Sequence, residues 1–138
     1  ANPGFLGDPS RSLPPNTYRP EDTQNYTALL AEFRKQLDQV GAETGQHYLL
    51  TIAAPAGETN YSKIELDKIH PYLDWINVMA YDMHGTWDAT GPTNIDAPLY
   101  TSPDDPSTGT DRVSVDSVIT AYLNAGIPPK KLIVGIPY

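Results

Sequence analysis

The stretch N-V-M-A-Y-D-M-H-G-T-W-D, residues 77–88, places side chains that hydrogen-bond and stack at the end of an apolar run. The Tyr81 hydroxyl can hold an amide or hydroxyl oxygen, and the Asp82 carboxylate can accept hydrogen bonds from hydroxyl groups. The Trp87 indole can stack on the apolar face of a sugar ring, and Met79 can fill a pocket wall. The four side chains fit a carbohydrate site, although each taken alone also fits ordinary packing.

Residues 74–82 predict a buried strand, because apolar residues dominate the run and alternate with others. One face comprises Ile76, Val78 and Ala80, and the other comprises Asn77, Met79 and Tyr81. Ligands of parallel α/β proteins bind at the carboxyl ends of strands, which is where Tyr81 and Asp82 lie. His84 follows closely, but no second ligand stands at a metal-binding spacing, so we expect no metal and no cofactor.

Three helices are predicted from apolar residues at helical spacing and from their end signals. The first covers residues 21–40, with Gly41 as its stop. The second covers 62–70, because Ser62 and Glu65 form a capping-box pattern. The third begins after Ser114 as N-cap and ends at Gly126.

Two further strands are predicted at residues 47–57 and 131–137, where short apolar runs are bounded by proline or glycine. Residues 1–20 and 83–113 are rich in proline and glycine and predict loops. A loop as long as 83–113 inside a domain is usually functional or disordered.

The resulting order, α-β-α-β-α-β, predicts an α/β fold with parallel strands. Three strands cannot close a barrel, and 138 residues are fewer than the roughly 250 of a typical (β/α)8 TIM barrel. A central slice of such a barrel explains why the chain starts in a loop and stops on a strand-like run, so we expect a fragment. A small doubly wound domain is the structural rival, but it lacks a glycine-rich phosphate motif.

Composition excludes several classes of protein. The net charge of −8 disfavours nucleic acid and anionic lipid as partners. No apolar stretch approaches the roughly 20 residues that span a bilayer. The absence of cysteine excludes disulfides and thiolate chemistry.

M-A-Y-D closing an I-N-V strand and followed by H-G-T-W-D strongly resembles the sixth-strand motif of family 18 glycoside hydrolases, the chitinases. Further segments resemble the same family in the same order. Residues 19–38 resemble its helix after the catalytic strand, and Y-L-L-T-I-A-A-P-A-G resembles its fifth strand. T-N-I-D-A-P-L-Y resembles a segment of its loop, and G-I-P-P-K-K-L-I-V-G-I-P-Y resembles the approach to its seventh strand. The resemblance covers about residues 19–138. Asp96 departs from it, because the family often has Asn there.

The resemblance implies a retaining, substrate-assisted hydrolysis of chitin or chito-oligosaccharides by a secreted, monomeric enzyme without a cofactor. It makes Tyr81 and Asp82 catalytic, and Met79, Trp87 and Asp96 substrate-binding. The family's proton donor is the last residue of D-x-x-D-x-D-x-E, which does not occur in residues 1–138. We therefore expect the donor to precede Ala1 and this part of a single catalytic domain to be inactive alone.

Three rivals remain. A chitinase-like lectin keeps the fold and the sugar groove without the acid, and the deciding position is outside this sequence. An endo-β-N-acetylglucosaminidase of the same family usually departs from M-x-Y-D. A generic α/β binding domain would require a fortuitous match.

Overall fold

A computed structural model describes residues 7, 12–15, 17–88, 91 and 93–138. In these residues three parallel strands form one sheet in the order β1-β2-β3. The strands are β1 (Thr51–Pro55), β2 (Trp75–Met79) and β3 (Leu132–Val134). The predicted parallel α/β architecture is confirmed, and each strand is shorter than its predicted range.

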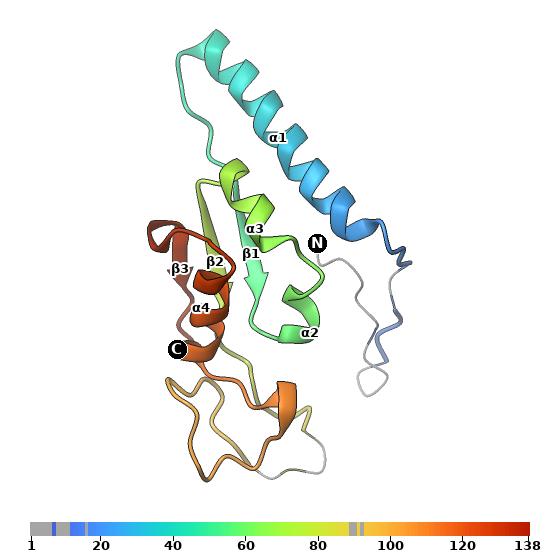
Figure 1. The fold of residues 1–138 in the computed structure, drawn as a ribbon, viewed down its shortest axis with the longest axis vertical. Coiled ribbons are helices and arrows are strands. Elements are labelled where there is room, and N and C mark those ends of the chain that lie inside the picture. Colours follow the sequence, from blue (N-terminus) through green and yellow to red (C-terminus); the bar gives the residue numbers. More distant parts are fainter. Residues whose placement is uncertain (1–6, 8–11, 16, 89–90, 92) are drawn as a thin grey trace.

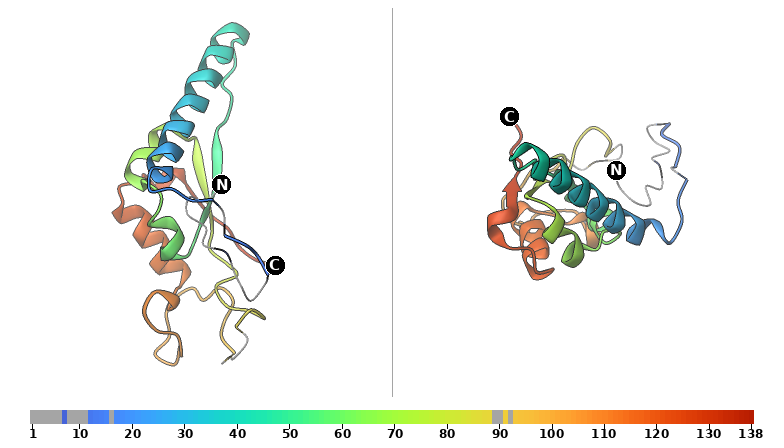
Figure 2. Two further views of the ribbon diagram at one scale, coloured as in Figure 1. Left: turned by 90° about the vertical axis from the view of Figure 1, so that its right-hand side faces the viewer. Right: turned by 90° about the horizontal axis from the view of Figure 1, so that it is seen from above.

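Helices connect the strands (Figure 1). They are α1 (Asp22–Thr44), α2 (Glu58–Tyr61), α3 (Leu66–Ile69) and α4 (Val115–Asn124), together with the 3₁₀ helices η2 (His70–Tyr72), η3 (Gly109–Asp111) and η4 (Pro129–Lys131). Figure 2 shows α1 extending well beyond the sheet, with the irregular loop before α4 at the opposite end of the molecule. The predicted loop over 83–113 contains only η3 among its described residues. Much of the predicted loop over 1–20 lies outside the described residues.

The first helix is longer than predicted, because Gly41 does not end it. The helix continues to Thr44, and Gly45 then takes a left-handed φ of 71°. The Gly45 N–H donates to the Gly41 carbonyl at 2.8 Å, which closes the final turn. The helix therefore ends at Gly45, which adopts the left-handed conformation, and not at Gly41, the first glycine in the sequence of the helix.

The capping box predicted at Ser62 is wrong. Ser62 follows the last residue of α2, and α3 starts only at Leu66. The Glu65 carboxylate that would have closed the box binds elsewhere: Oε2 accepts from the Thr27 hydroxyl at 2.7 Å and Oε1 from Lys68 Nζ at 2.5 Å. These contacts hold the pKa of Glu65 below its usual value, with the Lys68 bond as the largest cause. A tertiary contact with α1 therefore replaces the local cap.

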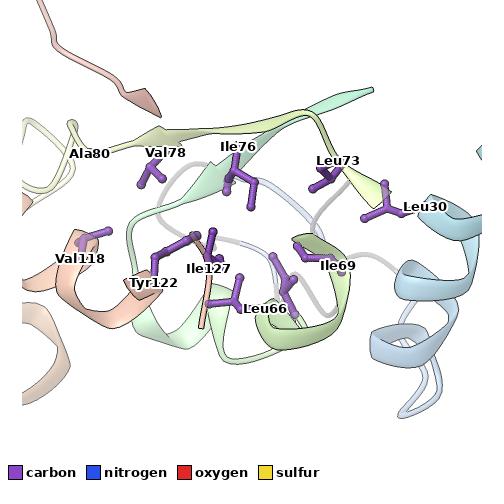
Figure 3. Packing of buried hydrophobic residues seen from close by; sticks show 12 residues of the cluster. Leu30, Leu66, Ile69, Leu73, Ile76, Val78, Ala80, Val118, Tyr122 and Ile127 are labelled. Atoms are coloured by element: carbon purple, nitrogen blue, oxygen red, sulfur yellow. The ribbon is translucent and has the colours of Figure 1, made fainter. Parts of the chain in front are cut away.

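The core lies between the sheet and helices α3 and α4 (Figure 3). Ile76, Val78 and Ala80 are fully buried, as their predicted shared face requires. Tyr122 of α4 is buried beside them, and its hydroxyl donates to the Pro55 carbonyl at 2.7 Å. This bond ties α4 to the carboxyl end of β1.

The start of α4 is fixed on two sides. Ser114 and Ser117 form a capping box, which confirms Ser114 as the N-cap, although N3 is a serine in place of the usual Glu or Gln. The first two helical N–H groups, of Val115 and Asp116, donate to the carbonyls of Pro98 and Leu99 at 2.9 and 3.1 Å. The preceding loop is thereby anchored to the helix.

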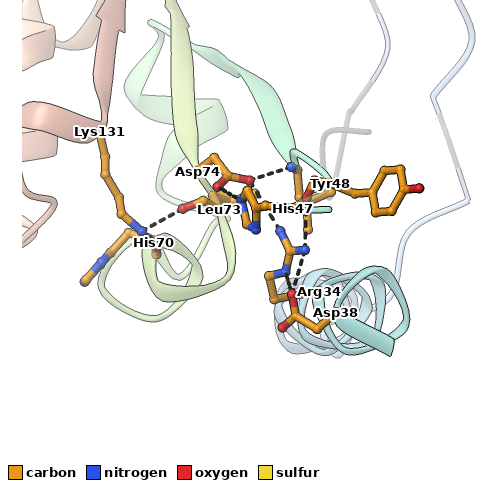
Figure 4. Close-up of polar contacts among 9 residues, drawn as sticks. Arg34, Asp38, His47, Tyr48, His70, Leu73, Asp74 and Lys131 are labelled. Carbon is orange, nitrogen blue, oxygen red and sulfur yellow. Dashed lines mark hydrogen bonds and ion pairs between the residues drawn. The ribbon is translucent and has the colours of Figure 1, made fainter. Parts of the chain in front are cut away.

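The amino ends of the strands are joined by a polar cluster centred on Asp74 (Figure 4). Its carboxylate accepts from the Leu50 N–H at 2.7 Å, lies 2.6 Å from His47 Nε2 and pairs with Arg34 at 3.3 Å. Burial raises the pKa of Asp74, but the Leu50 hydrogen bond, His47 and Arg34 together lower it below the usual value. The cluster connects α1 to the starts of β1 and β2.

Candidate active site at the carboxyl ends of the strands

A cavity of about 900 Å³ opens at the carboxyl edge of the sheet. The strand register aligns Pro55 of β1 with Met79 of β2, so the segments that follow both strands meet at this edge. The wall consists of Pro55 at the end of β1 with residues 56–60 after it, of Met79 at the end of β2 with residues 81–84 after it, and of parts of the loop up to Val113. The site therefore occupies the position where parallel α/β folds bind ligands.

The structure brings four of the five predicted site residues to this cavity: Met79, Tyr81, Asp82 and Trp87. Asp96 does not line it. Instead, Asp96 Oδ2 accepts from the Asp82 N–H at 3.4 Å, and its backbone carbonyl accepts from the Met83 N–H at 2.9 Å. In this arrangement Asp96 braces the backbone that presents Asp82, and its role toward substrate stays a prediction.

Tyr81 and Asp82 both reach the cavity because the backbone leaves strand geometry before them. In a continuous strand, consecutive side chains point to opposite faces. Here β2 ends at Met79, three residues before the predicted end, and Asp82 has a φ of 55°. The Val78 carbonyl accepts from the N–H groups of Ala80 and Gly135, each at 2.9 Å, which turns the chain away from the sheet.

Trp87 lies against the backbone of Gly85. A Cβ built on Gly85 would lie 2.5 to 2.8 Å from three atoms of the indole ring, closer than any real contact. The turn is closed by the Asp88 N–H, which donates to the Gly85 carbonyl at 3.0 Å, and by Asp88 Oδ2, which accepts from the Gly85 N–H at 3.1 Å. Glycine in H-G-T-W therefore allows the indole to lie over the turn.

His84 is a buried part of the cavity wall, with 8% of its surface exposed. Its Nε2 lies 3.2 Å from Asn94 Nδ2, and its Nδ1 lies 3.5 Å from Asp88 Oδ2. When Nε2 accepts from Asn94, Nδ1 carries a proton and faces the Asp88 carboxylate, so both neighbours are satisfied. These contacts give His84 a bracing role in the loop.

Asn94 also connects the two halves of the loop between β2 and α4. Its Nδ2 donates to Asp105 Oδ1 at 2.8 Å and lies 3.2 Å from Ser107 Oγ. The pKa of Asp105 lies below its usual value, and the largest cause is the hydrogen bond from the Ser107 N–H. Burial acts in the opposite direction. The Ser107 hydroxyl, the Asn94 amide and the Arg112 charge lower the pKa further. A loop without helix or strand over most of its length is thus held by side-chain bonds.

The described residues that line the cavity include four carboxylates, Glu58, Asp82, Asp88 and Asp111, and neither lysine nor arginine. Such a wall repels anions and accepts hydrogen bonds from a neutral, hydroxyl-rich ligand. In the described part of the chain, no group of three or more His, Asp or Glu side chains is arranged to hold a metal ion. No helix there has the length and apolar character needed to cross a bilayer.

A family model described as glycosyl hydrolases family 18 matches residues 9–138. The chain belongs to this family. It is 42% identical over 132 residues to chitinase A1 of Niallia circulans, which covers 94% of the chain and 19% of that protein. Among solved structures, the catalytic domain of the psychrophilic chitinase B from Arthrobacter TAD20 matches with a TM-score of 0.86 and 34% identity, over 98% of the chain and 31% of that structure. Chitinase ChiA74 from Bacillus thuringiensis matches with a TM-score of 0.84 and 46% identity, over 92% and 20%.

The family 18 chain therefore spans about a fifth to a third of the length of these relatives. Catalytic domains of family 18 are TIM barrels, and the three parallel strands with their helices form an α/β slice of one. The predicted resemblance and fold class are confirmed.

Sequence reasoning missed several residues of this family 18 site. It did not include the segment 55–60, Met83 or the His84–Asn94 contact, all of which belong to the cavity wall. It also gave no role to Gly85 or Gly135. A glycine within or beside a strand pattern is a signal of close backbone approach, and this signal could have singled out Gly135 in V-G-I-P.

Proposed function

We propose that the protein containing this family 18 chain is a chitinase that hydrolyses β-1,4 linkages between N-acetylglucosamine units of chitin and chito-oligosaccharides. One observation carries the proposal: Met79, Tyr81, Asp82 and Trp87 line a single acidic cavity at the carboxyl ends of parallel strands. Family membership and the names of the relatives support the same activity.

The proposed mechanism is retaining and uses the substrate's own acetamido group. The N-acetyl oxygen of the sugar before the cleaved bond attacks its own anomeric carbon while an enzyme acid protonates the leaving oxygen. The resulting oxazolinium ion is opened by water with retention. Tyr81 donates a hydrogen bond to the acetamido oxygen and fixes its line of attack, and such positioning can lower the barrier by several kcal/mol.

The other site residues act on the sugar around the cleaved bond. Asp82 hydrogen-bonds to the distorted sugar and, as a neighbouring carboxylate, favours the protonated form of the enzyme acid. Met79 lines the acetamido pocket, and Trp87 stacks on the sugar beyond the cut. Asp96 contributes by bracing the Asp82 backbone and remains a candidate for a direct contact with substrate.

The acid that protonates the leaving group is a Glu outside residues 1–138, because the motif that carries it in the family does not occur here. In the proposal these residues form part of one catalytic domain, with 1–20 following the catalytic strand and 83–113 linking β2 to α4. The chain by itself does not hydrolyse chitin, and the intact protein is a secreted monomer without a cofactor.

The test is Tyr81→Phe in the full-length protein, assayed with chitotetraose. We expect kcat to fall by about ten- to a hundredfold or more, since the change removes a donor used in the transition state. Tyr48→Phe is the matched control, because that ring belongs to the opposite end of the strands, next to the Asp74 cluster (Figure 4). The anomeric form of the first product, followed by NMR, reports retention or inversion.

Wild-type kcat in Tyr81→Phe, or an inverted first product, would overturn the mechanism. Binding of chitotetraose without any turnover by the wild-type protein would instead identify a carbohydrate-binding lectin.

A further inference from the structure

A narrow slot lies beside Tyr81, formed by Gly135 directly after β3. A Cβ built on Gly135 would lie 2.6 Å from Tyr81 Cε1 and 3.2 Å from Tyr81 Cδ1. It would also lie 2.8 Å from the Val78 carbonyl oxygen. Side-chain carbons do not approach other heavy atoms within 3.0 Å, so only glycine leaves the tyrosine ring in this place.

The backbone around the slot is held in place. The Val78 carbonyl accepts from the N–H groups of both Gly135 and Ala80 at 2.9 Å. Val78 itself is fully buried in β2 and pairs with Val134 of β3. A methyl group at position 135 must therefore either break the Gly135–Val78 bond or push the Tyr81 ring outward.

The second response moves the tyrosine hydroxyl. The contacts of Gly135 fall on one edge of the ring, between Cδ1 and Cε1, and the hydroxyl lies at the far end of that rigid ring. A tilt that restores an ordinary 3.5 Å contact displaces the hydroxyl by a comparable distance, on the order of 1 Å. Displacements of this size in a positioned group can reduce a rate by roughly a hundredfold.

We propose that Gly135 is a positioning residue for Tyr81: its missing side chain creates the slot that sets the direction of the Tyr81 hydroxyl in the cavity. The expected effect on catalysis rests on the proposed function, whereas the slot itself follows from the contacts of Gly135 alone. Gly135 has no side chain and does not line the cavity, so it acts through Tyr81 and not on the substrate.

A double-mutant cycle in the full-length protein tests this role, with Gly135→Ala, Tyr81→Phe and the combination assayed on chitotetraose. We expect Gly135→Ala to lower kcat at least tenfold while KM changes less than about threefold, because the methyl group misdirects a transition-state donor. In the Tyr81→Phe background the same change should lower kcat less than about threefold. Independent, multiplicative losses would overturn the proposal.

Gly45→Ala serves as the control for general destabilisation. Gly45 caps α1 with a left-handed φ of 71° and has no heavy atom within 4 Å of an added Cβ, so alanine there strains the backbone without crowding Tyr81. Below its melting temperature this variant should keep the wild-type kcat. A kcat loss in Gly45→Ala as large as that in Gly135→Ala would mean that destabilisation alone explains both.

A second cycle uses thermal stability and does not depend on chitinase activity. Gly135→Ala should lower the melting temperature by clearly more in wild type than in Tyr81→Ala, where the ring that meets the methyl group is absent. If Gly135→Ala alone does not fold, recovery of a folded Gly135→Ala/Tyr81→Ala protein supports the slot. Equal losses in both backgrounds, or no recovery, would place the crowding on Val78 and overturn the proposal.

A wild-type protein that is inactive on chitin would refute the proposed function. The stability cycle would then still decide whether the slot beside Tyr81 exists.

Discussion

Asp82 combines a carboxylate in the cavity wall with a backbone in the left-handed region. Aspartate and asparagine adopt this conformation more readily than other residues with a Cβ, because their short polar side chains bond locally. Alanine at such a position costs about 1 kcal/mol or more. The conformation also explains how a carboxylate can follow Tyr81 directly and still face the same cavity.

This conformation predicts a difference between two substitutions at one residue. Asp82→Asn should keep the free energy of unfolding within about 0.5 kcal/mol of wild type, whereas Asp82→Ala should lose about 1 kcal/mol through backbone strain. Urea unfolding of the full-length protein measures both. Equal stability of the alanine and asparagine variants would show that the left-handed backbone at position 82 is not strained.

At the scale of the elements, the hydroxyl of Tyr122 is the direct link between α4 and the end of β1. Burial raises the pKa of Tyr122 well above its usual value, and the neighbouring Tyr61 and Tyr26 raise it further. The rings of Tyr61 and Tyr122 meet edge to face with centroids 5.6 Å apart. Because Pro55 belongs to the cavity wall, this packing bears directly on the site.

Tyr122→Phe should lower the free energy of unfolding by about 1 kcal/mol, since it removes the hydrogen bond to the partly buried Pro55 carbonyl. A raised pKa in the folded state also means that Tyr122 stabilises the fold below about pH 10 and that this contribution is lost as pH rises above it. Stability curves between pH 8 and pH 11 should therefore fall more steeply for wild type than for the phenylalanine variant. Tyr48→Phe provides the comparison, and parallel curves for Tyr122→Phe and wild type would contradict the role of the hydroxyl.

The Asp74 cluster predicts the opposite pH dependence at the other end of the strands. Since the pKa of Asp74 is lowered in the folded state, its stabilisation is fully present above the unfolded value of about 4 and is lost as pH falls through the lower, folded value. Melting temperatures of wild type should decline more between pH 5 and pH 3 than those of Asp74→Asn. Asp104→Asn, at an exposed position of the loop before α4, is the control. An Asp74→Asn curve parallel to that of wild type would show that the cluster does not stabilise the fold.

The order of these elements was predictable from the sequence, but their ends were not. Alternation assigned Ile76, Val78 and Ala80 to the buried face, and Ser114 marked the start of α4, because both signals are local. The end of β2 depends on a carbonyl of Val78 shared with Gly135, more than fifty residues away, and the Glu65 cap is replaced by a contact with Thr27. The contact with Thr27 leaves no mark in the local pattern, and the contact of Val78 with Gly135 leaves only the glycine itself as a signal.

At the scale of the whole molecule, large apolar side chains remain exposed on two elements. Leu29, Phe33 and Val40 of α1 are 45–50% exposed, and Ile133 and Val134 of β3 are 40–48% exposed. In the described sheet, β1 and β3 also have one unpaired edge each. Exposed apolar surface and open strand edges favour association with another chain.

Residues 1–138 expressed alone should therefore associate. Sedimentation at increasing concentration should show species larger than a 15.1 kDa monomer. Leu29→Lys with Phe33→Lys should reduce the association, whereas the charge-matched pair Gln24→Lys and Gln39→Lys, at exposed polar positions of α1, should reduce it less. A cooperative, monomeric melt of the unmodified chain would contradict this expectation.

The residues of the cavity wall divide into those that the sequence predicted and those that only the assembled sheet reveals. Tyr81, Asp82, Met79 and Trp87 were assigned from one contiguous motif, and all four line the cavity. The segment 55–60 joins them only because β1 and β2 pair in register, with Pro55 opposite Met79. A wall assembled from separate strands follows from the sheet and not from any single stretch of residues.

The anchoring of the long loop has a consequence for engineering. Pro98 and Leu99 hold the first turn of α4, and Asn94 holds Asp105, so the intervening Tyr100 and Thr101, both exposed, form a short span between fixed points. An epitope tag or a grafted sugar-binding peptide inserted at this span would be flanked on both sides by residues that hydrogen bonds fix in place. Changes in loop length could therefore accumulate there, in the laboratory or during divergence of the family, while α4 and the end of β2 stay in register.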